Sequence, residues 1–335
     1  MREARFSAPT RVDLAGGTLD IWPVNLLAPP AMTVNVAIGL RATALVRPAP
    51  RFRVVNRARG LDRTGDGPEA FFDHPFTVLA GRLVDFFRPA APVEVRFRTT
   101  APAGSGLGGS SSLGMAIAGA LNRVCDAGWT IGELVRIVMD TEVRILGTST
   151  GAQDQLAAGL GATHAHHWES PAPRSERLPW ATDAGDPLKE RFALVFTGES
   201  HSSADPNGSV LERIFAGEPR ALRGIAEIAR AAAAMREALR ARDWDRARDA
   251  LDREWAARRQ LSPAVTTRTL DRFEASLREA GALAVKACGA GGGGTLLAMC
   301  APDRRPEILA AARAAGGDVL DVGSDPTGLS EDARP

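Results

Sequence analysis

A glycine- and serine-rich stretch at residues 102–114 constrains the fold more than any other part of the chain; it reads Pro-Ala-Gly-Ser-Gly-Leu-Gly-Gly-Ser-Ser-Ser-Leu-Gly. Residues 93–98 alternate apolar and polar side chains, which predicts a β-strand before it. Residues 110–125 are rich in small side chains and predict a helix after it. A turn without Cβ atoms lets a ligand approach the backbone, and the N–H groups that begin a helix bind anions. The stretch therefore predicts a site for an anion such as phosphate.

Two common phosphate-binding motifs do not account for this stretch. A Walker A loop requires a lysine after its last glycine, and the chain has lysine only at positions 189 and 286. The spacing Gly104-x-Gly106-x-x-Gly109 matches the dinucleotide fingerprint, which also needs a second strand that ends in an acidic residue about 20 positions later. Residues 130–146 instead have apolar side chains at helical spacing. A glycine turn that binds no ligand stays open as the alternative on these residues alone.

The overall composition excludes several classes of protein. At 335 residues with 44% hydrophobic content, the chain is long enough for two domains with their own cores. A net charge of +1 argues against a nucleic acid or a membrane surface as partner. The three cysteines have no metal-ligand spacing, and no apolar run approaches the ~20 residues of a membrane span. We therefore expect a soluble, cytoplasmic protein.

Three segments carry a resemblance to a known family. They are residues 9–20 (Pro-Thr-Arg-Val-Asp-Leu-Ala-Gly-Gly-Thr-Leu-Asp), residues 102–112, and residues 286–294 (Lys-Ala-Cys-Gly-Ala-Gly-Gly-Gly-Gly). In this order they resemble the three motifs of the GHMP kinases, the superfamily of galactokinase and of homoserine, mevalonate and phosphomevalonate kinases. Within that superfamily, residues 190–300 most resemble the branch that holds the heptose 7-phosphate kinases.

The resemblance implies the fold and the division of the chain. It implies an α+β, two-domain GHMP kinase fold. The N-terminal domain, residues 1–176, would be ribosomal protein S5 domain 2-like and hold the phosphate loop and the catalytic Asp. The C-terminal domain, residues 177–335, would be a ferredoxin-like α/β domain and hold the third, glycine-rich motif. We expect the active site between the two.

The resemblance also implies a reaction and the residues that perform it. The reaction is transfer of the γ-phosphoryl group of ATP, with Mg²⁺, to a hydroxyl of a sugar or sugar phosphate, and a heptose 7-phosphate is favoured. Asp154 and Arg11 are the catalytic candidates, and Glu142, which precedes Asp154 by 12 residues, would hold the metal together with Ser110. The candidates for the nucleotide phosphates are Gly104, Ser105, Gly106, Leu107, Gly108, Gly109, Ser110, Ser111 and Ser112. The candidates for the substrate are Gly17, Thr18, Asp20, Gln153, Gly291 and Gly292.

Several alternatives stay open from the sequence. The acceptor could be another small alcohol, as in galactokinase or mevalonate kinase, or the chain could be a silent regulator that binds nucleotide and sugar. A homodimer is possible. An arginine cluster at Arg57, Arg59 and Arg63 could meet a phosphate on the substrate, and His201 is a further candidate for a substrate contact. We expect His164, His166 and His167 to pack on a strand rather than bind a metal, and Lys286 to have a structural role.

Overall fold

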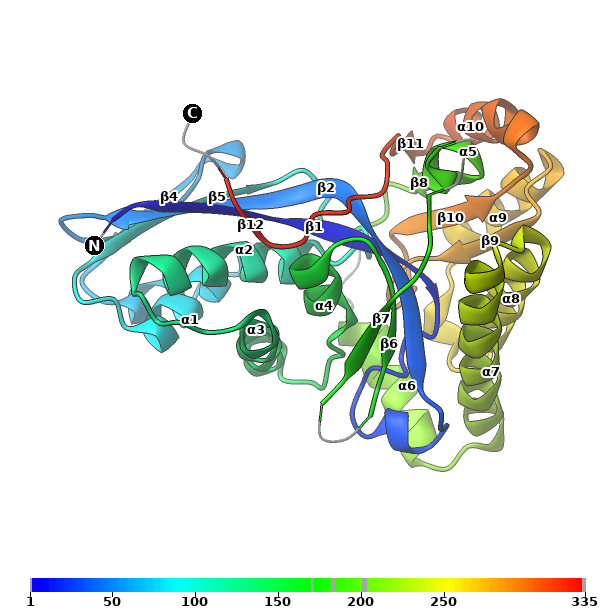
Figure 1. The fold of residues 1–335 in the computed structure, drawn as a ribbon, viewed down its shortest axis with the longest axis horizontal. Helices are drawn as coiled ribbons and strands as arrows, with labels where there is room; N and C mark the ends of the chain where they lie inside the picture. Colours follow the sequence, from blue (N-terminus) through cyan, green and yellow to red (C-terminus); the bar gives the residue numbers. More distant parts are fainter. Residues whose placement is uncertain (1, 170–171, 182–184, 201–203, 333–335) are drawn as a thin grey trace.

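The chain forms two β-sheets that lie end to end, each covered by helices (Figure 1). The structure is a computed structural model and describes residues 2–169, 172–181, 185–200 and 204–332. One sheet has eight strands and the other four, as expected for two α+β halves. Within the described residues, no helix is both long and apolar enough to cross a membrane.

The first sheet is built around two long antiparallel strands, β1 (Ala4–Ala15) and β2 (Met32–Pro48). Its strand order is β12-β1-β2-β5-β3-β4, and the beginning of β2 also pairs with β6, which pairs with β7. Because β2 has 17 residues, it pairs with two further strands besides β1: residues 42–48 pair with β5 and residues 32–36 pair with β6. The remaining strands are β3 (Phe52–Asn56), β4 (Leu61–Gly65), β5 (Val93–Thr99), β6 (Thr163–His167), β7 (Arg174–Arg177) and β12 (Ser330–Glu331).

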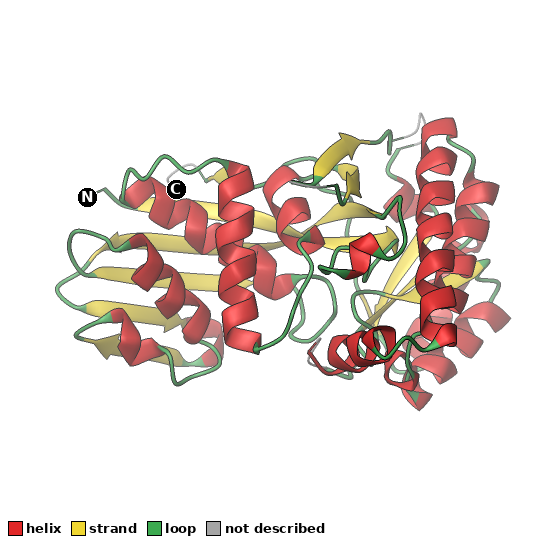
Figure 2. Cartoon of the chain, turned by 90° about the horizontal axis from the view of Figure 1, so that it is seen from below, coloured by secondary structure: helices red, strands yellow, loops and turns green. Residues whose placement is uncertain are grey.

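Four helices cover one face of this sheet (Figure 2). They are α1 (Val78–Phe87), α2 (Gly109–Val124), α3 (Ile131–Leu146) and α4 (Gln153–Leu160). The small side chains of α2 let it lie close against β1 and β2, with Met115, Ile117 and Leu121 fully buried. Helix α3 begins with a capping box, in which Thr130 and Glu133 satisfy each other's backbone N–H groups.

Three segments differ from the elements that the sequence predicts. Residue patterns predict a strand at residues 33–40, a surface loop at residues 57–68 and a turn at residues 170–175. In the structure the strand continues to Pro48, the loop contains β4, and β7 begins at Arg174, while residues 170–171 lie outside the described residues. Both unexpected strands lie at sheet edges, where half of the backbone groups face water and the side chains are largely polar. Such strands lack the apolar alternation that sequence patterns detect.

The second sheet is antiparallel, with the order β11-β8-β10-β9. Its strands are β8 (Phe192–Phe196), β9 (Ala284–Ala287), β10 (Thr295–Met299) and β11 (Asp318–Val319). The helices around it are α5 (Pro187–Glu190), α6 (Ala204–Phe215), α7 (Pro219–Ala241), α8 (Trp244–Arg258), α9 (Arg268–Glu279) and α10 (Arg305–Ala314). Short 3₁₀ helices occur at Val24–Leu26, Arg57–Arg59, Pro68–Phe71, Pro263–Val265 and Pro302–Arg304.

The two halves share a continuous apolar core. Val12 and Leu14 of β1 belong to the same buried cluster as Met235 of α7, Leu251 of α8 and Leu297 of β10. Because these side chains are at most 2% exposed, the halves are packed against each other rather than merely joined by a linker.

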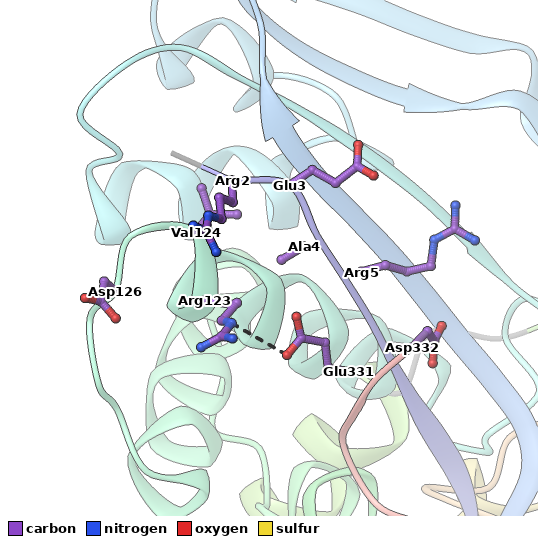
Figure 3. A pocket seen from close by; sticks show the side chains of 9 residues that line it. All are labelled: Arg2, Glu3, Ala4, Arg5, Arg123, Val124, Asp126, Glu331 and Asp332. Carbon is purple, nitrogen blue, oxygen red and sulfur yellow. Dashed lines mark ion pairs between the residues drawn. The ribbon is translucent and has the colours of Figure 1, made fainter. Parts of the chain in front are cut away.

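The last described residues return to the first sheet instead of forming a free polar tail. Asp325 binds Arg41, and β12 pairs with the start of β1. Figure 3 shows Glu331 of β12 beside Arg123, next to a cavity of about 500 Å³ that mixes basic and acidic side chains. This cavity shares no lining residue with the cavity described below.

Candidate functional site

A cavity of about 520 Å³, here called the central cavity, lies where the two halves meet. Its walls come from the glycine turn at residues 102–109, the turn after β1, helices α3 and α4, and the turn between β9 and β10. Asn207 of α6 and Arg258 of α8 complete the wall from the second half. The three segments of the family resemblance, which are far apart in the sequence, therefore meet at one site.

The glycine turn presents its backbone and the start of α2 to the central cavity. Gly108 precedes the first residue of α2 with a φ of 76°, a conformation that favours glycine. The first N–H groups of α2 have no intrahelical acceptor, so they can donate to an anion there. The lining residues of this region are Gly104, Ser105, Gly106, Gly108, Gly109, Ser110 and Ser111.

Two of the nine residues predicted to contact the nucleotide phosphates do not line the central cavity. Leu107 is fully buried in the core shared by the two halves, and its carbonyl accepts from the backbone N–H of Arg11 at 3.0 Å. Ser112 is also fully buried, and its hydroxyl donates to the carbonyl of Ala8 at 2.7 Å. Both residues hold the turn against β1. For Ser112 the reason is that the helical twist of α2 directs only part of its first turn toward the cavity.

Arg11 and Asp154 form an ion pair at the mouth of the glycine turn. Nε and Nη2 of Arg11 lie 2.8 Å and 2.6 Å from Oδ1 of Asp154, and Nη1 donates to the carbonyl of Gly106 at 2.6 Å. Burial favours the neutral form of Arg11, but the carboxylates of Asp154 and Asp13 outweigh it and raise its pKa. The Asp154 side chain is 24% exposed, so it remains accessible from the cavity. Its position is tightly defined, since a Cβ on Gly108 would lie 3.0 Å from Oδ2 of Asp154.

Glu142 of α3 lies beside the first turn of α2. Its Oε2 accepts from the hydroxyl of Ser111 at 2.7 Å and from Nε2 of Gln155 at 2.6 Å, and it also interacts with the side chain of Ser110. Burial raises the pKa of Glu142, and the nearby charge of Asp154 adds to this. Gln155, which the sequence did not single out, therefore holds Glu142 in place.

This oxygen-rich arrangement fits Mg²⁺ only with ligands supplied by a nucleotide and water. No group of three or more His, Cys, Asp or Glu side chains suited to a metal occurs among the described residues. Mg²⁺ is usually bound through one or two carboxylates plus phosphates and several waters. Glu142, with the hydroxyl groups of Ser110 and Ser111 beside it and the glycine turn next to it, fits this kind of Mg²⁺ site.

Asp20 follows the turn after β1 and lies beside Gln153 at the start of α4. Its carboxylate accepts from the backbone N–H of Gln153 at 3.3 Å and from Nε2 of Gln153 at 3.4 Å. Burial, followed by repulsion from Asp154, raises the pKa of Asp20 to about 6. Thr18, Asp20 and Gln153 all line the central cavity, as predicted for residues that bind a substrate.

The other three residues predicted to bind substrate lie outside the cavity lining. A Cβ on Gly17 would lie 2.0 Å from Nη2 of Arg258, so this glycine makes room for an arginine. Gly291 and Gly292 pack against the segment at residues 264–265 and Pro206. In the turn between β9 and β10, the residues that line the cavity are Gly289 and Ala290. Gly289 approaches the glycine turn so closely that a Cβ there would be 2.6 Å from the carbonyl oxygen of Gly106.

The far end of the central cavity is apolar and was not identified from the sequence. It is lined by Phe76, Leu79, Phe97, Leu113, Ile145 and Leu146. The guanidinium of Arg59 lies 4.3 Å from the ring centre of Phe76. Of the three arginines expected to meet a substrate phosphate, only Arg59 lines the cavity, whereas Arg63 is paired with Asp73.

Four charged residues behind the site form a buried cluster, here called the ion cluster. Lys286 Nζ lies 2.8 Å from Oδ2 of Asp13 and 3.0 Å from Oε2 of Glu254, and Arg258 Nη2 lies 2.7 Å from Oε1 of Glu254. None of the four is more than 2% exposed, and they connect β1 with α8 and β9. Burial acts to raise the pKa of Asp13, but Lys286, Arg258 and Arg11 outweigh it and lower it to about 2. Lys286 thus has the structural environment expected for it.

Sequence reasoning missed Glu254 and Arg258. The available signal was an acidic and a basic residue four positions apart, which can form an ion pair on a helix. In a helix as rich in charge as α8, the same spacing is equally typical of an exposed face, so it does not indicate burial.

The histidines of β6 pack as expected. His164 and His166 stack with ring centres 5.6 Å apart, and His166 bonds to Ser175 and Asn35. His167 bonds to Glu176. His201 lies outside the described residues.

Comparison with known proteins agrees with the fold. Residues 77–162 match the family model of the GHMP kinases N terminal domain, and residues 235–318 match that of the GHMP kinases C terminal domain. The chain is 25% identical over 334 residues to the D-glycero-alpha-D-manno-heptose 7-phosphate kinase of Campylobacter jejuni, an alignment that covers 96% of each protein.

Two further similarities concern a longer protein and a solved structure. The chain is 25% identical over 337 residues to the L-fucokinase/L-fucose-1-P guanylyltransferase of Bacteroides fragilis; the alignment covers 90% of the chain but spans only 35% of that relative's length. A crystal structure of a D-glycero-D-manno-heptose 1-phosphate kinase from Bacteroides thetaiotaomicron superposes with a TM-score of 0.79 at 21% identity and 99% coverage of each chain, which shows the common fold. With both family models matched in order and three glycine-containing motifs meeting at one cavity, the chain belongs to the GHMP kinase superfamily.

Proposed function

We propose that this chain is an ATP-dependent sugar kinase and that its acceptor is a heptose phosphate or a related sugar. The observation that carries the proposal is the Arg11–Asp154 pair beside the glycine turn: Arg11 also bonds to the carbonyl of Gly106, and a Cβ added at Gly108 would lie 3.0 Å from Oδ2 of Asp154. A phosphoryl group held by the turn and an acceptor hydroxyl beside Asp154 would be adjacent. Kinases need this proximity, because positioning and charge stabilisation supply most of the catalysis of phosphoryl transfer.

Each part of the cavity has a chemical task in this proposal. The N–H groups of the glycine turn and the start of α2 bind the phosphates, and the apolar end around Phe76 and Leu113 accommodates the base. Asp154 accepts the proton of the acceptor hydroxyl or orients it, while Arg11 keeps Asp154 ionised and donates toward the transferred group. Asp20, Thr18 and Gln153 contact the sugar.

Mg²⁺ would be held by Glu142 and Ser110. When bound, the ion neutralises charge on the phosphates. Ser111 and Gln155 orient the Glu142 carboxylate by donating to its Oε2.

The choice of acceptor is supported by the relatives. One of those reported is named as a heptose 7-phosphate kinase and matches along 96% of its length, and another as an L-fucokinase. Both names describe kinases of sugars, and Asp20 and Gln153 offer the mixture of acceptors and donors that hydroxyl groups require.

The proposal is tested by incubating the protein with Mg²⁺-ATP and a panel of acceptors. The panel contains D-glycero-D-manno-heptose 7-phosphate, L-fucose, galactose and mevalonate, with ADP release followed by a coupled assay and the product identified by phosphorus NMR. We expect the heptose phosphate to be phosphorylated. Loss of a general base typically costs 10²–10⁴-fold, so Asp154→Asn should lower kcat by about that factor.

The matched control is Asp140→Asn, which changes an exposed aspartate on α3 and should leave kcat unaltered. ATP should raise the melting temperature of both variants, because neither lies in the base-binding end of the cavity. Stabilisation by ATP without phosphorylation of any member of the panel would favour a silent regulator instead.

A further inference from the structure

Arg258 reaches the central cavity from behind, although it belongs to the ion cluster. It lines the cavity and is 2% exposed, so nearly all of its surface is covered by protein. Its Nη2 lies against the turn at residues 16–20, since a Cβ on Gly17 would be 2.0 Å away. That turn ends in Asp20, whose negative charge contributes to the electrostatic environment of Arg258.

The guanidinium makes three hydrogen bonds within the protein and has further donors that these bonds do not use. Nε and Nη2 donate to Oε1 of Glu254 at 3.0 Å and 2.7 Å, and Nη1 donates to the carbonyl of Gly289 at 2.8 Å. These contacts use three of its five N–H groups. One N–H on each terminal nitrogen has no hydrogen-bond acceptor among the described residues. The carboxylate oxygen Oδ2 of Asp13 is 3.6 Å from Nη2, which is too far for a hydrogen bond.

Such an arginine differs from a surface arginine in what it can do for a ligand. Glu254 and Gly289 prevent rotation of the guanidinium, so a ligand oxygen would meet donors that are already in position. Asp13 and Glu254 together balance the charges of Arg258 and Lys286, so Arg258 does not act as an unpaired cation that would attract any anion. This combination favours a neutral oxygen, such as a sugar hydroxyl or ring oxygen.

We propose that Arg258 is a specificity-determining residue that donates hydrogen bonds to an oxygen of the acceptor sugar, while Asp20 accepts from a hydroxyl of the same sugar. The proposal rests on the function proposed above and extends it. A group with adjacent hydroxyls can satisfy both residues at once, because each hydroxyl donates and accepts. The ion cluster then serves to hold one of the sugar-binding groups, in addition to joining the two halves.

The test compares Arg258→Gln and Arg258→Lys with Arg259→Gln. Arg259 is the next residue on the chain but is 37% exposed and paired with Asp271, so its replacement controls for the loss of an arginine. Loss of a hydrogen bond from a charged donor should raise KM for heptose 7-phosphate by about 10- to 100-fold in Arg258→Gln, with KM for ATP nearly unchanged. Arg258→Lys keeps the positive charge and a donor group, so its KM for the acceptor should lie between those of the wild-type protein and Arg258→Gln.

Acceptors that lack single hydroxyls separate binding from a purely structural role. Monodeoxy analogues of heptose 7-phosphate, or of the panel sugar that is phosphorylated fastest, are compared in the wild-type protein and in Arg258→Gln. For one analogue, removal of the hydroxyl should lower kcat/KM strongly in the wild-type protein. The same removal should lower kcat/KM only slightly in Arg258→Gln, because the contact to that hydroxyl is already missing there. The proposal is overturned if every analogue suffers the same loss in both proteins, or if the variants alter KM for ATP and for the acceptor equally.

Failure of the proposed function would look different. In that case the wild-type protein itself would phosphorylate no member of the panel. If Arg258→Gln does not fold, Arg258→Lys carries the same comparison, because a lysine can still pair with Glu254.

Discussion

Replacing Lys286 by methionine tests the energetic importance of the ion cluster. The ammonium group lies 2.8 Å from Asp13 and 3.0 Å from Glu254, and all three side chains are fully buried. Methionine preserves most of the packing of the alkyl chain but removes one positive charge, so that Asp13 keeps only Arg258 and Arg11, and Glu254 only Arg258, as cationic neighbours. Breaking a buried ion pair by removing one partner typically costs about 3–5 kcal/mol, because an uncompensated charge remains in the interior. We expect Lys286→Met to lower the free energy of unfolding by about that amount.

Thermal and urea unfolding measure this loss. A loss of 1 kcal/mol lowers the melting temperature of a large domain by about 2 °C, so the expected decrease is roughly 6–10 °C. The matched control is Lys189→Met, since Lys189 is the chain's other lysine and is exposed. The control should melt within about 1 °C of the wild-type protein.

The dependence on pH provides a second check. In the wild-type protein the pKa of Asp13 is lowered from 3.8 to about 2. The resulting stabilisation is present above about pH 4 and is lost as the pH falls toward 2. Without Lys286 the pKa of Asp13 should rise, so the difference between the two proteins should be largest above pH 4 and smaller below it. A variant as stable as the wild-type protein at neutral pH, or a difference that does not change with pH, would refute this reasoning.

Two further predictions concern the groups that bind metal and sugar. Glu142→Gln should raise the Mg²⁺ concentration needed for half-maximal activity by about tenfold or more, because an amide is a weaker ligand than a carboxylate; an unchanged Mg²⁺ titration would argue against Glu142 as a ligand. Asp20 has its pKa raised to about 6, so KM for the acceptor should increase as the pH falls below 6, and Asp20→Asn should abolish this dependence. Since a raised pKa means that ionisation of Asp20 destabilises the folded state, Asp20→Asn should also melt higher than the wild-type protein at pH 8, and a lower melting temperature would contradict the assignment.

Local patterns were sufficient for much of the fold. The strand predicted at residues 93–98 and the helices predicted from residues 110 and 130 all appear near the predicted positions. These elements are recognisable because one face of each is buried, which imposes a periodicity on the sequence. The edge strands β4 and β7 carry no such pattern, and the pairing of β12 with β1 depends on residues more than 300 positions apart.

The site divides in the same way. The glycine turn and the order of the three motifs could be predicted from the sequence, because each motif consists of a few adjacent residues and the turn needs glycine where φ is positive. The packing of the folded chain, in contrast, places Leu107 and Ser112 in the core and brings Arg258 rather than Gly17 to the cavity. The physical reason is that the direction and burial of a side chain depend on which distant element packs against it. The ion cluster shows this most clearly, since Asp13, Glu254 and Lys286 acquire their partners only when β1, α8 and β9 come together.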